Sequence, residues 1–173
     1  MKEGSKNEYG RKKMKICKTL TACTFLILSL ALTTSLVMAD EELNAEFQVA
    51  AGMGQIERVQ SLLRQGAEVN SRAPSAGNVP AGGTAIMLAA ARNHIEVVKL
   101  LISHGADVNQ ADEGEGTPLI YSVWKGHKDI VALLLEKGAD IYAKTRDGRT
   151  PLSVAKQYGH TEIEKMLKAA ANK

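Results

Sequence analysis

The sequence predicts an all-α fold in which a pair of short helices, joined by a turn, recurs several times along the chain. Short motifs recur at intervals of 33 residues, after one first interval of 39. The residues that typically begin and end helices fall at matching places in successive units. One pair of helices cannot bury its own apolar side, so we expect neighbouring pairs to stack and to share a core.

Three motifs define the unit. A turn of Gly-Ala, an acidic residue, an aliphatic residue and Asn or Tyr occurs at 66–70, 105–109 and 138–142. A histidine recurs as His94, His127 and His160. The string Thr-Pro-Leu occurs at 117–119 and 150–152, with the weaker counterpart Thr84-Ala85-Ile86. The first interval is longer because six extra residues separate the turn of the first unit from the start of the second.

Each helix has a local reason to begin and to end. Thr117 can cap the first helix of its unit, and Pro118 suits the first helical position because its missing N–H would be unpaired there. Gly126 ends this helix, since glycine adopts a left-handed conformation freely. Gly54, Asn93 and Gly159 hold the same place in the other units. The second helix carries the apolar stripe Ile130, Val131, Leu134 and Leu135.

The segments 84–109 and 117–142 resemble ankyrin repeats, and the similarity extends over about residues 43–167. The match is specific, because the Thr-Pro-Leu start, the Gly-His corner and the Gly-Ala-Asp turn agree in register. The resemblance implies an all-α ankyrin-repeat solenoid of about four helix–turn–helix repeats with short β-turn or hairpin connections. We expect a domain over 40–173, with repeats at about 42–72, 84–111, 116–144 and 149–173 and an insertion loop at 71–83.

The sequence departs from the ankyrin pattern at two kinds of position. The family's histidine after Thr-Pro-Leu is replaced by Met87, Ile120 and Ser153, so the hydrogen bonds of that histidine are expected to be lost or remade. Glu115 stands where the family has a turn glycine.

Residues 1–39 predict an N-terminal signal peptide. The whole chain carries a net charge of +3, but seven basic residues, two acidic residues and both cysteines precede Asp40. Basic residues up to Lys18 are followed by an uncharged, largely apolar run that reaches Ala39, after which we expect cleavage. A start at Met14 would give the leader an ordinary length.

Two alternatives for the leader stay open, namely lipidation at Cys23 and retention as an uncleaved membrane anchor. In each case the basic flank stays inside and the repeats cross the membrane. The repeat domain is therefore expected in the periplasm, or outside the membrane while anchored to it, or secreted.

The composition of residues 40–173 argues against several classes of function. The segment has no cysteine, which excludes a disulfide scaffold, a Cys-ligated zinc site and a thiol nucleophile. Its net charge of −2 gives no reason to expect nucleic acid. No nucleophile elbow or phosphate loop is present. We expect no enzymatic activity, no cofactor, no metal and no small-molecule substrate.

The histidines and the acidic turn have structural interpretations. Equivalent positions of stacked repeats lie about 8–10 Å apart, too far to share a zinc ion, so each corner histidine is expected to bond to the backbone. His104 is expected to cap the end of its helix. The carboxylates of Asp112, Glu113 and Glu115 lack the spacing of a calcium loop and predict a solvated acidic turn.

The resemblance implies a protein partner, bound by the turn tips and by the exposed face of the first helices, which together form a concave surface. The matching residues are Arg92, Glu113, Trp124, Lys125, Arg146, Arg149, Gln157 and Tyr158. Trp124 is the most informative, because stacking does not require an aromatic residue there and tryptophan is common in interface hot spots. The alternative is that Trp124 packs against Tyr158 or Ala91 and only closes the stack.

The sequence thus predicts a monomeric, exported ankyrin-repeat protein that binds another protein through its concave face and has no catalytic activity. Within this class it resembles secreted bacterial proteins that support a periplasmic oxidative-stress enzyme, neutralise a periplasm-acting toxin or bind a host protein. Outside this class, a membrane-anchored scaffold and an enzyme that uses the turn carboxylates stay open as functions. The insertion at 71–83 is either a partner contact or a tolerated surface loop.

Overall fold

The computed structural model describes residues 40–73 and 81–172. Chain contacts separate residues 1–41 from residues 42–173, and the following description concerns the second unit. The predicted leader, with its cleavage site and with Met14 and Cys23, lies outside the described residues, as do residues 74–80 of the predicted insertion. Among the described residues, no helix combines the length and the apolar character needed to cross a membrane.

The fold is all-α, as predicted, with eight helices in the described part of the chain. The first helix ends at residue 52, and the others are α2 (Ile56–Arg64), α3 (Ala85–Ala91), α4 (Ile95–Ser103), α5 (Pro118–Lys125), α6 (Lys128–Glu136), α7 (Pro151–Gln157) and α8 (Thr161–Ala171).

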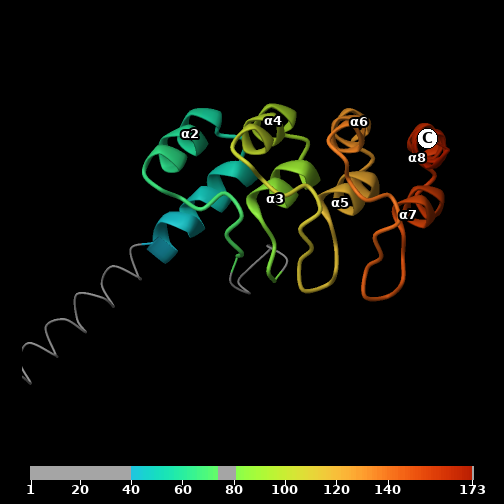
Figure 1. Cartoon of the computed structure of the whole chain (residues 1–173), viewed down its shortest axis with the longest axis horizontal. Helices are drawn as coiled ribbons and strands as arrows, with labels where there is room; N and C mark the ends of the chain where they lie inside the picture. The colour runs from blue at the N-terminus through green and yellow to red at the C-terminus, as the bar shows by residue number, and fades with distance from the viewer. Residues whose placement is uncertain (1–39, 74–80, 173) are drawn as a thin grey trace, which may run out of the picture. The chain divides into compact units, whose positions relative to one another are not determined.

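The helices form four antiparallel pairs that stack side by side. Figure 1 shows the second helices of the pairs, α2, α4, α6 and α8, in one row and the first helices α3, α5 and α7 in a parallel row. Contacts run within the pairs α3–α4, α5–α6 and α7–α8 and between neighbours of the same row. The loops that follow the second helices project beyond the first-helix row, and we call their hairpin ends the fingers.

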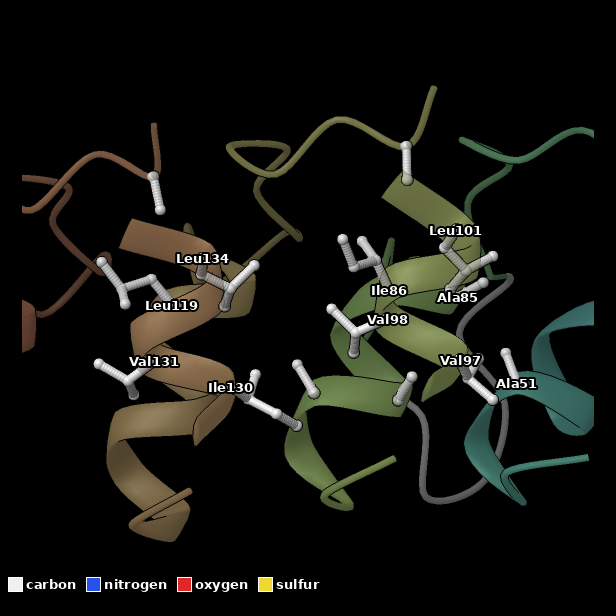
Figure 2. Packing of buried hydrophobic residues seen from close by; sticks show 14 of the residues in the cluster. Ala51, Ala85, Ile86, Val97, Val98, Leu101, Leu119, Ile130, Val131 and Leu134 are labelled. Carbon is white, nitrogen blue, oxygen red and sulfur yellow. The ribbon is translucent and has the colours of Figure 1, made fainter. Parts of the chain in front are cut away.

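The core lies between the two rows and continues through the stack. Figure 2 shows labelled side chains of α3 to α6 directed into the spaces between helices. The large side chains with less than 2% exposure include Phe47, Val59, Leu62, Ile86, Met87, Val97, Val98, Leu101, Leu119, Val123, Ile130, Val131 and Leu134. Each such side chain contributes about 1.5–3 kcal/mol by its removal from water.

The helix ends form as the local sequence predicts. The side chain of Thr117 accepts the N–H of Ile120 at 3.3 Å, and Pro118 occupies the first turn. Gly126 and Asn93 adopt left-handed conformations with φ of 75° and 65°. His104 places Nδ1 at 2.9 Å from the carbonyl oxygen of Leu100, which confirms its capping role.

The residues that replace the family's histidine remake its bonds in some units only. Ser153 forms a capping box with Thr150, in which each side chain bonds to the other's backbone N–H. Met87 is fully buried and apolar, and Thr84 Oγ1 has no hydrogen-bond partner among the described residues. In the first unit Gln48 holds the equivalent position and donates to the carbonyl oxygen of Ser71 at 3.0 Å.

The corner histidines connect each unit to the one before it. Nε2 lies 3.0 Å from the Gly52 oxygen in His94, 3.1 Å from the Ala91 oxygen in His127 and 3.3 Å from the Trp124 oxygen in His160. The predicted bond to backbone is confirmed, and its acceptor belongs to the end of the preceding first helix. Without the histidines, these carbonyl groups at the helix ends would have no backbone N–H of their own helix as a partner.

Two asparagines make a second series of connections near the other end of the second helices. Asn109 donates from Nδ2 to the Gly138 oxygen at 3.1 Å and accepts the N–H of Asp140 at 2.7 Å. Asn70 makes the same pair of bonds, at 3.1 and 2.9 Å, to the following unit. Tyr142 holds the equivalent place in the third unit and is 68% exposed.

The fingers form a third series. A backbone hydrogen bond closes the base of each finger. The N–H groups of Ala73, Asp112 and Thr145 donate to the carbonyl oxygens of Gly83, Gly116 and Arg149 at 2.8, 3.0 and 3.0 Å. Neighbouring fingers are joined by Glu113 N–H to the Ala81 oxygen and Arg146 N–H to the Gly114 oxygen, both at 2.9 Å.

Glu115 occupies a backbone conformation that favours glycine. Its φ is 62°, whereas the equivalent residues Gly82 and Gly148 have φ of 72° and 80°. A left-handed conformation costs a residue with a side chain about 1–2 kcal/mol. The departure from the family pattern at this turn thus carries a local cost in backbone strain.

Asn109→Ala should lower the free energy of unfolding by about 1–3 kcal/mol, because it removes two hydrogen bonds of about 0.5–1.5 kcal/mol each between the second and third repeats. Tyr142→Ala, at the equivalent position, should change it by less than about 0.5 kcal/mol, as expected of an exposed side chain. Urea unfolding followed by circular dichroism measures both values. Equal effects of the two substitutions would contradict the assigned role of the asparagines.

Candidate functional site

An aromatic cluster occupies the centre of the exposed side of the first helices. Trp124 and Tyr121 are three residues apart and share one side of α5. The Trp124 ring lies 6.4 Å from the Tyr121 ring and 6.3 Å from the Tyr158 ring, measured between centroids. The Lys125 ammonium lies 4.1 Å from the centre of the Trp124 ring, a cation–π contact. Trp124 nevertheless remains 40% exposed.

Two grooves lie on either side of Trp124. The first groove, between α3 and α5, has a volume of about 600 Å³ and is lined by Met87, Leu88, Ala91, Arg92, Tyr121, Trp124, Lys125 and His127. The second groove, between α5 and α7, has a volume of about 450 Å³, and its lining includes Ile120, Tyr121, Trp124, Asp147, Arg149, Val154 and Tyr158.

The structure brings together five of the eight predicted site residues. Arg92 and Lys125 line the first groove, Arg149 and Tyr158 line the second, and Trp124 lines both. Arg149 is paired with Asp147 at 2.6 Å, so its charge is locally balanced.

Gln157, Glu113 and Arg146 lie apart from the grooves. Gln157 is exposed at the end of α7 and lines neither of them. Glu113 and Arg146 are exposed at the fingers, where the Arg146 guanidinium donates to the carbonyl oxygen of Glu113. Together with the backbone bonds of the fingers, this contact gives both residues a role in joining adjacent repeats.

Asp112 corrects the prediction of a solvated acidic turn. Its side chain is buried, with 6% exposure, and accepts the N–H of Gly116 at 2.8 Å and the hydroxyl of Tyr121 at 2.5 Å. Burial, followed by the bond to Asp112 and its negative charge, raises the pKa of the Tyr121 phenol well above its ordinary value. Tyr121 therefore stays protonated and fixes the second finger to α5. Glu113 and Glu115 are exposed, as a solvated turn requires.

Tyr121 was absent from the residues that the sequence singled out, although it lines both grooves. A usable signal was its position three residues before Trp124, which places both on one side of a helix. The two interpretations of Trp124 are compatible. One side of its ring packs against Tyr158 of the next repeat, and the remaining surface is exposed between the grooves.

Two family models match the chain. One, described as ankyrin repeats in three copies, covers residues 47–145. The other, described as ankyrin repeats in many copies, covers residues 125–167. Together they span the four helix pairs almost completely.

Asp112→Asn should lower the pKa of Tyr121 toward its ordinary value without restoring it, because the carboxylate is lost while burial, the larger cause, remains. Since the folded-state pKa of this phenol is raised, its contribution to stability is present below the unfolded pKa of 10.0 and is lost as the pH rises above that value. Tyrosinate absorbance during an alkaline titration measures the shift. Superimposable titrations of the wild type and the variant would contradict the Asp112 contact.

Proposed function

Because the chain belongs to the ankyrin-repeat family, whose repeats serve protein–protein interaction, we propose that it is an exported protein that binds another protein through its first-helix face. We define this face as the exposed side of the first helices together with the fingers. Members of the family are typically non-catalytic binding scaffolds, and we propose no catalytic activity for this chain.

The exposed Trp124 between two grooves carries the proposal. A tryptophan beside an apolar depression, surrounded by Tyr, Arg and Lys, has the composition of an interface hot spot. The rings of Tyr121 and Tyr158 both pack near the Trp124 ring, and the His160 side chain lies within hydrogen-bonding distance of the Trp124 carbonyl oxygen. A partner would therefore meet a preorganised surface, which reduces the entropic cost of binding.

Export is supported by the N-terminal sequence. Basic residues precede an uncharged run that begins after Lys18 and ends before Asp40, the pattern of a secretory signal. We propose the periplasm of a bacterium as the destination. Toxin neutralisation, support of a periplasmic enzyme, a membrane-anchored scaffold and a secreted effector remain the candidate roles.

Replacing both Trp124 and Lys125 by alanine should abolish capture of the partner, because the central aromatic anchor and its adjacent cation are removed. The loss for one hot-spot tryptophan corresponds to at least about 2 kcal/mol of binding free energy. Affinity capture with quantitative mass spectrometry, on wild-type and variant chains, measures the change.

The matched control replaces Tyr142 and Lys144 by alanine. These are an exposed aromatic residue and an exposed cation that line neither groove. This double variant should capture the same proteins as the wild type. Unchanged capture by the Trp124 and Lys125 variant would contradict the proposed binding face.

Leu28→Arg should keep the chain inside the cell at its full length, because a charge interrupts the apolar run of the leader. The wild-type chain should instead be recovered from the periplasmic fraction with Asp40 as its N-terminal residue. Cell fractionation and N-terminal sequencing test both expectations. A wild-type chain found uncut in the cytosol would contradict export.

A further inference from the structure

We propose that the partner segment that occupies the first groove is an acidic peptide, in which carboxylates flank a large apolar side chain. This inference rests on the proposed function, since it specifies the chemistry of what the first-helix face binds. The inference is argued from the charges around the groove and from the apolar residues that line it.

Among the residues that the structure describes, two cations and no carboxylate line the first groove. The Lys125 ammonium lies above the Trp124 ring. The Arg92 guanidinium lies so close to Gly52 of the preceding repeat that a side chain at position 52 would collide with it. Within the described parts of the chain, neither Arg92 nor Lys125 lies within 4.0 Å of a carboxylate. Both positive charges are therefore available to a ligand.

The row of first helices has the same bias. Three positions of each repeat, related by the 39- and 33-residue intervals, lie along the first-helix row. They are Val49, Gly52 and Met53; Leu88, Ala91 and Arg92; Tyr121, Trp124 and Lys125; and Val154, Gln157 and Tyr158. These twelve positions hold two cations and no acidic residue, although residues 40–173 as a whole carry a net charge of −2. The charged side chains at these positions of the first-helix row are thus all basic, whereas the fingers, which complete the first-helix face, carry Glu113, Glu115 and Asp147.

A groove on the second-helix row provides a contrast. It has a volume of about 370 Å³ and is lined by Lys99, Ile102, Ser103, Leu133 and Lys137. Lys99 is paired with Glu96 at 2.8 Å and Lys137 with Glu136 at 3.1 Å. Both grooves are lined by apolar residues and two cations, but within the described residues only the cations of the first groove lie more than 4.0 Å from every carboxylate.

The apolar residues of the first groove favour a ligand that carries an apolar group as well as negative charge. Met87, Leu88 and Ala91 line the groove together with Trp124. A leucine or phenylalanine side chain would bury apolar surface there, while its acidic neighbours approach Arg92 and Lys125. Nucleic acid fits less well, because two cations neutralise few phosphates.

The experiment uses Trp124, which is the only tryptophan of the chain, as its fluorescent reporter. The full chain is titrated with three short synthetic peptides of equal length. One has two leucines flanked by aspartates and glutamates, the second has lysines in place of the acids, and the third keeps the acids but has glycines in place of the leucines. The first peptide should change the Trp124 emission and bind at least about tenfold more tightly than either of the others.

Charge reversal provides the decisive comparison. Arg92→Glu with Lys125→Glu should weaken binding of the acidic peptide at least about tenfold and create binding of the lysine peptide. Lys99→Glu with Lys137→Glu makes the same change of charge on the second-helix row and should leave both affinities unchanged. Lys125→Glu alone should give an intermediate loss, and circular dichroism verifies that every variant is folded.

Three results would overturn the inference. These are equal binding of the acidic and lysine peptides, no binding of any peptide, and equal or tighter binding of a single-stranded oligothymidylate. The proposed function would survive each of them if capture of a protein still depended on Trp124 and Lys125. Loss of that dependence would instead contradict the proposed function itself.

Discussion

The structure depends on the fact that each helix pair supplies only part of the apolar surface that it needs to bury. Val97 and Val98 on α4, for example, are fully buried in a core that continues through neighbouring pairs. Apolar stacking of this kind is strong but poorly directional. The polar contacts between repeats fix the relative orientation of neighbouring helix pairs, because the corner histidines, the asparagines and the fingers connect neighbours at three separate places.

These contacts also shape the candidate binding face. Trp124 takes part in both roles, since its ring lies between the grooves while its backbone oxygen faces the His160 ring. The Asp112 carboxylate likewise holds Tyr121 and the second finger together. Binding surface and repeat interface are therefore built from the same residues, which explains why the two interpretations of Trp124 could not be separated by its position in the sequence.

Much of the fold could be predicted from the sequence, because helix starts at Thr-Pro, left-handed corner residues and apolar stripes are local signals. The candidate site was predicted in part, since Trp124 is distinctive in its repeat. The burial of Asp112 and the contact between Arg146 and Glu113 could not be predicted in this way. Both depend on how a finger lies against its own helix or its neighbour, and no periodic pattern in the sequence records that geometry.

The exposed Tyr142 has a consequence for how firmly the last repeat is held. Tyr142 lies in the third repeat and lacks the amide that Asn70 and Asn109 offer to the following unit. The fourth repeat is therefore joined to the third without the pair of bonds that each asparagine supplies. Local unfolding should for this reason begin at the fourth repeat, while the earlier repeats stay stacked.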